Sequence, residues 1–197
     1  MKCLVVVAHP LSHSACRALT QAAVRLLQAQ GHEVLVEDLY SSDFAPALTA
    51  VERTSYYAAS FNAEAVQPQA QRLIEAQALV LVFPTWWFGF PAILKGWFDR
   101  VWAPGIAYDH AKDLGAIQPR LLNLRNALVI TTLGSPWWVD RLVMRQPVKR
   151  VLKTALLGTC APACTLTMLS LYKAERLTKN QLDVFARRIE KVIALWK

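Results

Sequence analysis

The sequence predicts an α/β protein built around a doubly wound, parallel β-sheet. Predicted strands alternate five times with segments of helical periodicity. Some of these strands are short, continuous apolar runs, which are typical of strands buried on both faces of a parallel sheet. The 197 residues are enough for one domain, expected to span residues 1–197, with a full hydrophobic core. Because crossover connections are right-handed, the loops that follow the strands should meet at one edge of the sheet.

The first half of the chain supplies three of the five strands, expected at residues 3–8, 33–37 and 78–82. After the first strand, apolar residues at helical spacing predict a helix over residues 15–30, and Gly31 ends it. Thr49 is a suitable N-cap for a short helix. Pro68 begins another helix that reaches about residue 76.

The second half continues the alternation, with strands expected at residues 126–132 and 163–168. An amphipathic helix begins at Pro91 and ends at Pro104-Gly105. Residues 139–157 show a broken helical periodicity, and Thr178 is a suitable N-cap for a last amphipathic helix.

An aromatic loop joins the third strand to the helix that follows it. Its residues are Pro84, Thr85, Trp86, Trp87 and Phe88. Open α/β sheets bind ligands at the carboxyl ends of their strands, and three consecutive aromatic residues there would form an exposed patch unless a flat molecule covers them. The alternative is that they pack in the core or in a subunit contact, and loop position alone leaves both interpretations open.

The loop after the first strand directly precedes a helix and contains His9, Ser14, Ala15 and Cys16. Amides at a helix N-terminus bind phosphate well. The loop lacks the repeated glycines of a dinucleotide fingerprint, so a Rossmann-type NAD site is disfavoured. Taken alone, Ser14 is better explained as an ordinary N-cap, and His9 could face an anion or hydrogen-bond the loop backbone.

The loop after the fourth strand begins with Thr131, Thr132, Leu133 and Gly134. Its hydroxyls and amides could hold the edge of a heterocycle, although the residues that follow also suit an ordinary turn. A phosphate loop, an aromatic loop and a polar turn on one edge suggest a flat, phosphorylated cofactor. Flavin fits this combination better than an adenine nucleotide, because the aromatic side chains leave room for a broad ring.

Charge is distributed unevenly along the chain. Residues 1–119 carry 8 basic and 10 acidic side chains, whereas residues 120–197 carry 14 basic and 4 acidic ones. A basic half can indicate nucleic-acid binding, a solvated face, or a field that attracts anionic cofactors and substrates. No nucleic-acid motif accompanies the charge, so a nucleic-acid partner is not expected.

Several other classes of protein are disfavoured. No apolar run is long enough to cross a membrane, and His9-Pro10 interrupts the N-terminal apolar run where a signal peptide would continue. Four cysteines without an export signal indicate reduced thiols in the cytoplasm. The four histidines lack metal-ligand spacing, and no serine lies in a nucleophile elbow.

A set of motifs resembles one family closely. They are Ala8-His9-Pro10, Asp38-Leu39-Tyr40 with Phe44 and Pro46, Phe83-Pro84 with Trp86-Trp87, Pro91-Ala92-Ile93-Leu94-Lys95-Gly96-Trp97 with Asp99-Arg100-Val101, Gly105 with Ala107-Tyr108, and Thr131-Thr132. This pattern resembles the NAD(P)H:quinone oxidoreductase family of flavodoxin-like flavoproteins, densely from residue 4 to about residue 134. The resemblance implies a five-stranded sheet of order 2-1-3-4-5.

The resemblance also implies a homodimer with one FAD or FMN per subunit, and two-electron, ping-pong reduction of quinones by NAD(P)H. His9, Ser14, Ala15 and Cys16 would line the phosphate loop, residues 84–88 would follow the isoalloxazine ring, and residues 131–134 its pyrimidine side. Tyr108 and His110 would reach the acceptor pocket from the partner subunit and assist catalysis.

Two functions from other classes remain open. One is a flavodoxin-type electron carrier without a nicotinamide reaction. The other is a regulatory subunit of a potassium efflux system, because the family also resembles the ancillary subunits of such systems. In that role, the basic second half would contact an acidic peripheral protein partner.

Overall fold

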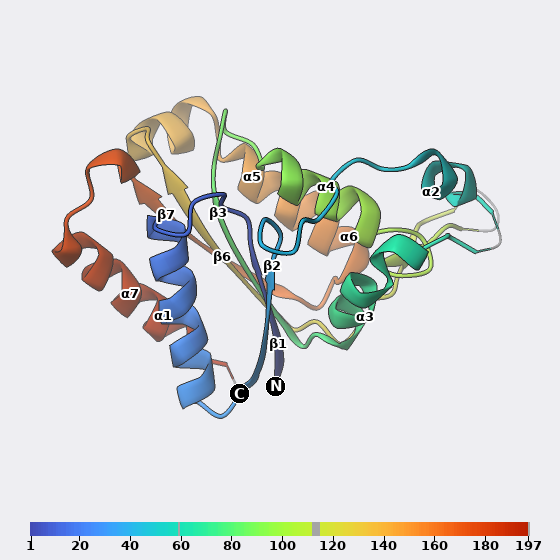
Figure 1. Cartoon of the computed structure of the whole chain (residues 1–197), viewed down its shortest axis with the longest axis horizontal. Helices are drawn as coiled ribbons and strands as arrows, with labels where there is room; N and C mark the ends of the chain where they lie inside the picture. Colours follow the sequence, from blue (N-terminus) through green and yellow to red (C-terminus); the bar gives the residue numbers. More distant parts are fainter. Residues whose placement is uncertain (59, 112–114, 197) are drawn as a thin grey trace.

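The computed structural model describes residues 1–58, 60–111 and 115–196. Its centre is a parallel sheet of five strands (Figure 1): β1 (Lys2–Val7), β2 (Glu33–Asp38), β3 (Ala78–Pro84), β6 (Asn126–Leu133) and β7 (Thr165–Tyr172). The strand order is β2-β1-β3-β6-β7 and every pairing is parallel. The predicted doubly wound sheet and its order 2-1-3-4-5 are therefore confirmed.

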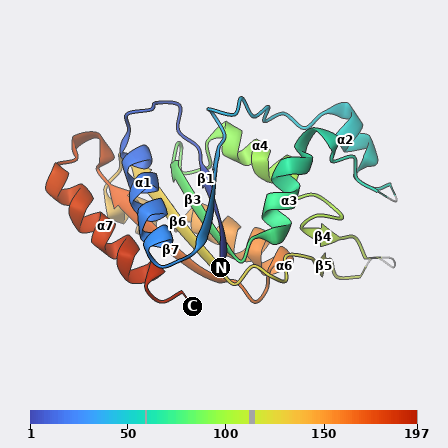
Figure 2. The same ribbon diagram turned by 60° about the horizontal axis from the view of Figure 1, so that its bottom comes forward.

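Helices cover both faces of the sheet (Figures 1 and 2). One face carries α1 (Ala15–Ala29) and α7 (Lys179–Ile193), which contact each other. The other carries α3 (Gln67–Glu75), α4 (Ala92–Val101), α5 (Pro147–Arg150) and α6 (Gly158–Cys160). Alternate residues of a strand point to opposite faces, so Val5 joins the core under α1 and Leu4 joins the core under α4.

The residues predicted to begin and end helices are found in these positions. Ser14 caps α1 by accepting a hydrogen bond from the Arg17 amide. Thr49 and Thr178 each form a capping box, at the start of α2 (Ala50–Ser55) and of α7. Gly31 has a φ of 75°, the left-handed conformation that favours glycine after a helix.

The broken periodicity of residues 139–157 corresponds to an interrupted helix. Two π-helical segments, Val139–Val143 and Val151–Leu157, flank the short α5. Arg145 and Gln146 between them have φ values of 57° and 49°. Two left-handed residues followed by Pro147 end the first segment, because that backbone cannot continue a right-handed helix.

The last strand begins and ends later than expected, at Thr165–Tyr172 rather than at residues 163–168. β7 lies at the edge of the sheet, and polar residues such as Ser170 interrupt its apolar run. Its extent is fixed by backbone pairing with the whole of β6, up to Leu133 opposite Tyr172.

Two short turns and a small ladder complete the elements of the described chain. Residues Glu64–Val66 and Ala174–Arg176 form 3₁₀ turns, and β4 (Tyr108–Asp109) pairs with β5 (Gln118–Pro119) in a small antiparallel ladder. Figure 2 shows β4, β5 and α2 at one end of the molecule and α7 at the other.

Candidate functional site

The three predicted loops meet at the carboxyl edge of the sheet. There they line a cleft of about 440 Å³, a size within the usual range of small-molecule sites. Its walls are His9, Leu11, Ser14, Ala15, Cys16, Pro84, Thr85, Trp86, Thr132, Gly134, Ala174 and Glu175.

The N-terminus of α1 forms one wall of this cleft. The first amides of a helix have no acceptor within the helix. Ser14 Oγ accepts from the Arg17 amide at 3.3 Å, which leaves the amides of Ala15 and Cys16 beside the cleft that these residues line. Amides in this position, together with the helix dipole, stabilise a bound anion such as a phosphate.

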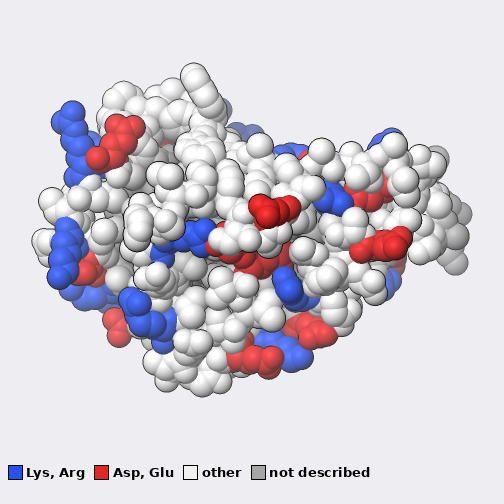
Figure 3. All heavy atoms as spheres, in the orientation of Figure 1, with Lys and Arg blue, Asp and Glu red and all other residues white. Residues whose placement is uncertain are grey.

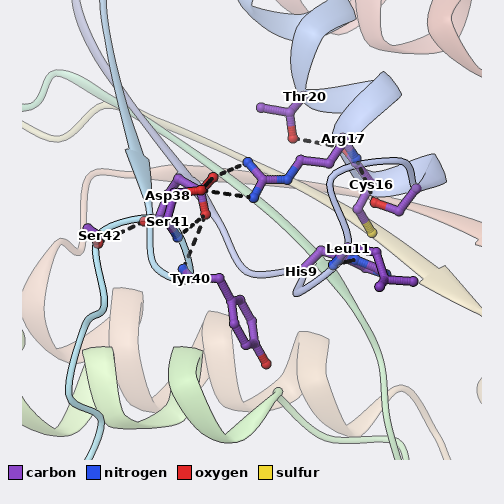
Figure 4. A network of polar contacts seen from close by, with 10 residues as sticks. His9, Leu11, Cys16, Arg17, Thr20, Asp38, Tyr40, Ser41 and Ser42 are labelled. Carbon is purple, nitrogen blue, oxygen red and sulfur yellow. Dashed lines mark hydrogen bonds and ion pairs between the residues drawn. The ribbon is translucent and has the colours of Figure 1, made fainter.

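His9 forms a hydrogen bond with its own loop. This favours the interpretation that its side chain binds the loop backbone over the one in which it faces an anion. Its Nδ1 accepts from the Leu11 amide at 3.1 Å (Figure 4). Burial and the nearby Arg17 lower the pKa of His9. The ring is therefore held neutral near pH 7 with its proton on Nε2, the nitrogen that remains able to donate.

Behind the same loop, Arg17 is held by an acidic partner. Its guanidinium forms an ion pair with Asp38 at the end of β2 and donates to Ser41 Oγ at 3.4 Å. Asp38 Oδ1 also accepts from the Tyr40 and Ser41 amides (Figure 4). This network ties the first turn of α1 to the loop after β2, so the cleft wall is fixed before any ligand binds.

The aromatic loop forms a tight turn with an unusual backbone. The Gly89 amide donates to the Trp86 carbonyl at 2.9 Å, and the two residues between them, Trp87 and Phe88, have φ values of 50° and 57°. This is the pattern of a type I′ turn, which normally contains Asn and Gly. Bulky residues cost about 1–3 kcal/mol each in this conformation, and such strain is concentrated at functional sites.

Hydroxyl groups form the floor of the cleft between β3 and β6. Thr85 Oγ1 is hydrogen-bonded to Thr131 Oγ1, and the Thr85 amide donates to the Thr132 carbonyl at 2.8 Å. Thr132 Oγ1 lies 3.5 Å from Cys16 Sγ, which joins the floor to the helix wall. The floor therefore offers polar groups beside the exposed indole of Trp86.

Most of the predicted cofactor residues lie on the cleft, but four do not. Thr131 and Leu133 are buried beneath the floor. Phe88 lies beyond the cleft wall, and the side chain of Trp87 is completely exposed. These four residues support the site or extend past it in this subunit.

Three cleft residues were not predicted from the sequence: Leu11, Ala174 and Glu175. Ala174 and Glu175 follow β7, whose end lies four residues beyond its predicted limit. Placing the end of that strand correctly would have placed this loop at the carboxyl edge. The Glu175 carboxylate lies close to Gly134. A Cβ atom built on Gly134 would lie 3.0 Å from Glu175 Oε1, so a larger side chain at residue 134 would crowd the cleft.

Tyr108 and His110 lie outside the cleft of their own subunit. His110 stacks on Tyr57 with ring centroids 4.7 Å apart and meets Tyr108 edge-on at 5.4 Å. Its Nε2 lies 3.1 Å from the Tyr56 carbonyl oxygen. A carbonyl only accepts, so in this contact Nε2 donates and Nδ1 stays available. Burial and the neighbouring Tyr56 raise the pKa of Tyr108 far above its ordinary value, so its phenol remains protonated.

Other kinds of site find no support in the described parts of the chain. Among residues 1–58, 60–111 and 115–196, no group of His, Cys, Asp or Glu is arranged to hold a metal ion. All four cysteines are free, and burial raises the pKa of Cys16 to about 11. Within the same ranges, no helix combines the length and apolar character that crossing a bilayer requires.

The sheet order and the position of the cleft define the class: an α/β protein of flavodoxin-like architecture with its candidate site at the carboxyl edge of the strands. Residues 1–187 match the Flavodoxin_2 family, which is described by its flavodoxin-like fold. The chain belongs to this family.

Known proteins extend the comparison. Over 152 residues, the chain is 38% identical to NAD(P)H dehydrogenase (quinone) 1 of Cavia porcellus, covering 68% of this chain and 54% of that protein. It is also 38% identical to the ribosyldihydronicotinamide dehydrogenase-like protein traD of Penicillium crustosum, covering 68% of this chain and 58% of that protein. The chain thus spans about half the length of the curated relatives it matches.

A solved structure matches over almost the whole chain. The NAD(P)H:quinone oxidoreductase of Methanothermobacter marburgensis is 27% identical and superimposes with a TM-score of 0.83, over 98% of this chain and 94% of that one. The predicted resemblance to quinone oxidoreductases is confirmed.

Proposed function

We propose that this protein is a flavin-dependent NAD(P)H oxidoreductase that reduces quinones or similar two-electron acceptors. The observation that carries the proposal is the cleft itself, which combines helix-terminal amides, a hydroxyl floor and an exposed indole within about 440 Å³. The names of the relatives, which are NAD(P)H and ribosyldihydronicotinamide dehydrogenases of quinones, support the same reaction class.

The residues of the cleft fit a flavin. The amides of Ala15 and Cys16 would bind its phosphate, Trp86 would contact the ring, and Thr132 and Gly134 would face the polar edge of the ring. A flavin held by these residues, either FAD or FMN, would supply the hydride-transfer chemistry between a nicotinamide and the acceptor. The protein contributes position, exclusion of water and hydrogen bonds.

The site would be completed by a second copy of the chain. Tyr108 and His110 lie at the α2 end of the molecule, away from their own cleft. We therefore propose a homodimer in which these residues cover the cleft of the partner subunit, where His110 would hydrogen-bond the acceptor oxygen that becomes negative during reduction.

The test is flavin binding by a Trp86→Ala variant, with Trp137→Ala as a control. Trp137 is also exposed but lies outside the cleft. Losing a stacked aromatic side chain costs about 1 kcal/mol beyond area burial, or about a fivefold loss of affinity. Equal flavin affinity in both folded variants would contradict this placement of the ring.

A second measurement tests the reaction. Anaerobic addition of NADH or NADPH to the yellow holoprotein should bleach the flavin absorbance, and a quinone should restore it. A flavin that stays oxidised would instead favour the electron-carrier alternative.

A further inference from the structure

A stretch of exposed basic and apolar residues follows directly after the cleft floor. Its members are Trp137, Trp138, Arg141, Leu142, Val143, Met144 and Arg145, all of which are exposed. Leu142 and Val143 show 65% and 61% of their surfaces to solvent. We call these seven residues the lip. In the view of Figure 3, uncharged atoms cover most of the upper edge of the molecule.

The lip is held outward by specific contacts. Asp140 is buried beneath it, accepting from Tyr172 Oη of β7 at 2.8 Å, and its carbonyl accepts from the Gln146 amide at 2.8 Å. Arg145 and Gln146 adopt left-handed backbone conformations that turn the chain back toward the body. The exposure of the lip therefore belongs to a fixed structure and not to a loose loop.

The lip and the cleft share one edge of the sheet. β6 ends at Leu133, and Pro84 of β3 pairs with Thr132 of β6. Gly134 lines the cleft and the lip begins three residues later. The aromatic turn at Trp86 and Trp87 leaves from the same edge, so four tryptophans surround this end of the molecule.

The composition of the lip matches a lipid interface. Indole rings favour the boundary between headgroups and acyl chains, and exposed aliphatic side chains beside Arg and Lys are typical of elements that lie in that boundary. Five basic residues and one acidic residue occur between Trp137 and Lys153, and the acidic one is the buried Asp140. We propose that the lip docks this protein on the surface of an anionic lipid bilayer.

Charge and shape favour a bilayer over the other occupants. In a two-fold contact centred on the lip, Arg141 and Arg145 of one copy would face the same residues of the other, and like charges repel. A protein partner would need pockets for the protruding Leu142 and Val143, whereas a bilayer accepts such side chains without a complementary shape. An anionic surface also attracts each basic residue near it.

Docking on a bilayer would also explain where the acceptor comes from. This part of the proposal rests on the proposed function. The lip would hold the cleft next to the bilayer, so that a quinone dissolved in the lipid could reach the site without crossing water.

The experiment is vesicle flotation of the flavin-loaded chain of residues 1–197. Phosphatidylcholine vesicles, with and without phosphatidylglycerol, are compared for wild type, for Arg141→Glu/Arg145→Glu and for Leu142→Ser/Val143→Ser. The control is Arg187→Glu/Lys191→Glu, which makes the same change in charge on the exposed face of α7. Wild type should float only with the anionic vesicles. The binding of each lip variant to these vesicles should be at least about tenfold weaker than that of wild type, and the binding of the control should stay within about twofold of wild type.

Three results would overturn the proposal: no flotation of wild type, an equal loss in the α7 control, or lip variants that change the oligomer size while vesicle binding stays the same. The last result would show that a second copy covers the lip. Reduction of a water-soluble quinone should be equal in wild type and lip variants. If no quinone is reduced but flotation persists, the proposed function fails and the docking stands.

Discussion

At the residue scale, the aromatic turn combines an unfavourable backbone conformation with an exposed side chain. Trp87 exposes its whole side chain while its backbone has a φ of 50°. Folding gains nothing from an indole that is fully exposed, and a bulky side chain disfavours this backbone conformation. The residue is therefore better explained by an interaction outside its own subunit than by the stability of the fold.

Replacing Trp87 with Asn should stabilise the protein. Asn tolerates the left-handed region and is preferred in type I′ turns, so the free energy of unfolding should rise by about 1 kcal/mol. Chemical denaturation checks this, with Trp137→Asn as the control for loss of an exposed indole. A lower stability in Trp87→Asn would show that the turn is not strained.

His110 tests the proposed acceptor pocket. Because Nε2 is engaged by the Tyr56 carbonyl, His110 could donate to an acceptor through Nδ1 only when its ring is protonated. His110→Phe keeps the ring and removes the donor. We expect slower quinone reduction with a flattened pH profile, while flavin reduction by NAD(P)H changes little.

Stopped-flow measurement separates the two half-reactions. If both keep wild-type rates over about pH 6–8, the range in which histidine usually changes charge, His110 has no part in the reaction.

At the element scale, α4 is held in place by a close contact, a buried hydrogen bond and a buried ion pair. The backbone of Pro46 occupies the space where a Cβ of Gly96 would lie. Trp97 Nε1 donates to Glu37 Oε1 at 2.7 Å, and Arg100 forms an ion pair with Glu52 at 2.7 Å. These contacts join α4 to β2 and α2, and so they position the aromatic turn that precedes α4.

Gly96→Ala should be destabilising. Alanine favours a helix by about 1 kcal/mol over glycine, but at residue 96 its methyl group would overlap the Pro46 backbone, and overpacking typically costs about 1–3 kcal/mol. We expect a net loss of stability in urea unfolding. Gly115→Ala is the control, since a Cβ there would make only an ordinary contact, at 3.6 Å. Equal stabilities would contradict the close approach.

The Glu52–Arg100 pair should make stability depend on pH. Burial alone would raise the pKa of Glu52, but hydrogen bonds from Arg100 and Thr49 outweigh it, so the pKa lies below its ordinary value of 4.5. A carboxyl with a lowered pKa stabilises the fold above that value, and the stabilisation is lost as the pH falls through the folded-state pKa.

Glu52→Gln leaves Arg100 buried without a charged partner and should cost about 3 kcal/mol at pH 7. The difference from wild type should shrink as the pH falls below 4.5. Denaturation at several pH values measures it, and Glu75→Gln, at an exposed pair with Lys2, should show little effect. A difference that does not vary with pH would exclude the linkage.

At the scale of the whole molecule, the proposed site needs two subunits. The high hydrophobic content, 54% of residues, also exceeds what a single core requires and is consistent with a subunit interface. That residues 1–197 form one domain stays a prediction, and a single cooperative unfolding transition would support it.

Mixing two impaired variants at limiting flavin tests the shared site. Trp86→Ala damages the cleft and His110→Phe damages the cover, so a mixed dimer has one intact site if the two parts come from different subunits. Random exchange should restore about a quarter of the wild-type sites. If mixing gives no gain in quinone reduction while mass spectrometry of the intact dimers shows that subunits have exchanged, both parts belong to the same subunit. A fully active monomer would exclude the dimer altogether.

The sequence by itself determined the local structure of this protein. Period and capping residues predict where α1, α2 and α7 begin, because a cap such as Thr49 acts within one turn of its helix. Continuous apolar runs predict β1, β3 and β6, and the short run Val34-Leu35-Val36 between two glutamates lies in the predicted strand that corresponds to β2. Right-handed crossovers then bring the loops containing Ser14, Trp86 and Thr132 to one edge, so most of the cleft could be predicted before any coordinates.

Only the tertiary structure decided the rest. The end of β7, and with it Glu175 in the cleft wall, depends on backbone pairing with β6, because Ser170 interrupts the apolar run that Leu169 and Leu171 form. The left-handed turn at Trp87 and the exposure of Leu142 depend on the contacts that surround them. The local sequence pattern shows which residues favour burial. The aromatic turn and the lip contain apolar residues that tertiary packing keeps exposed despite that preference.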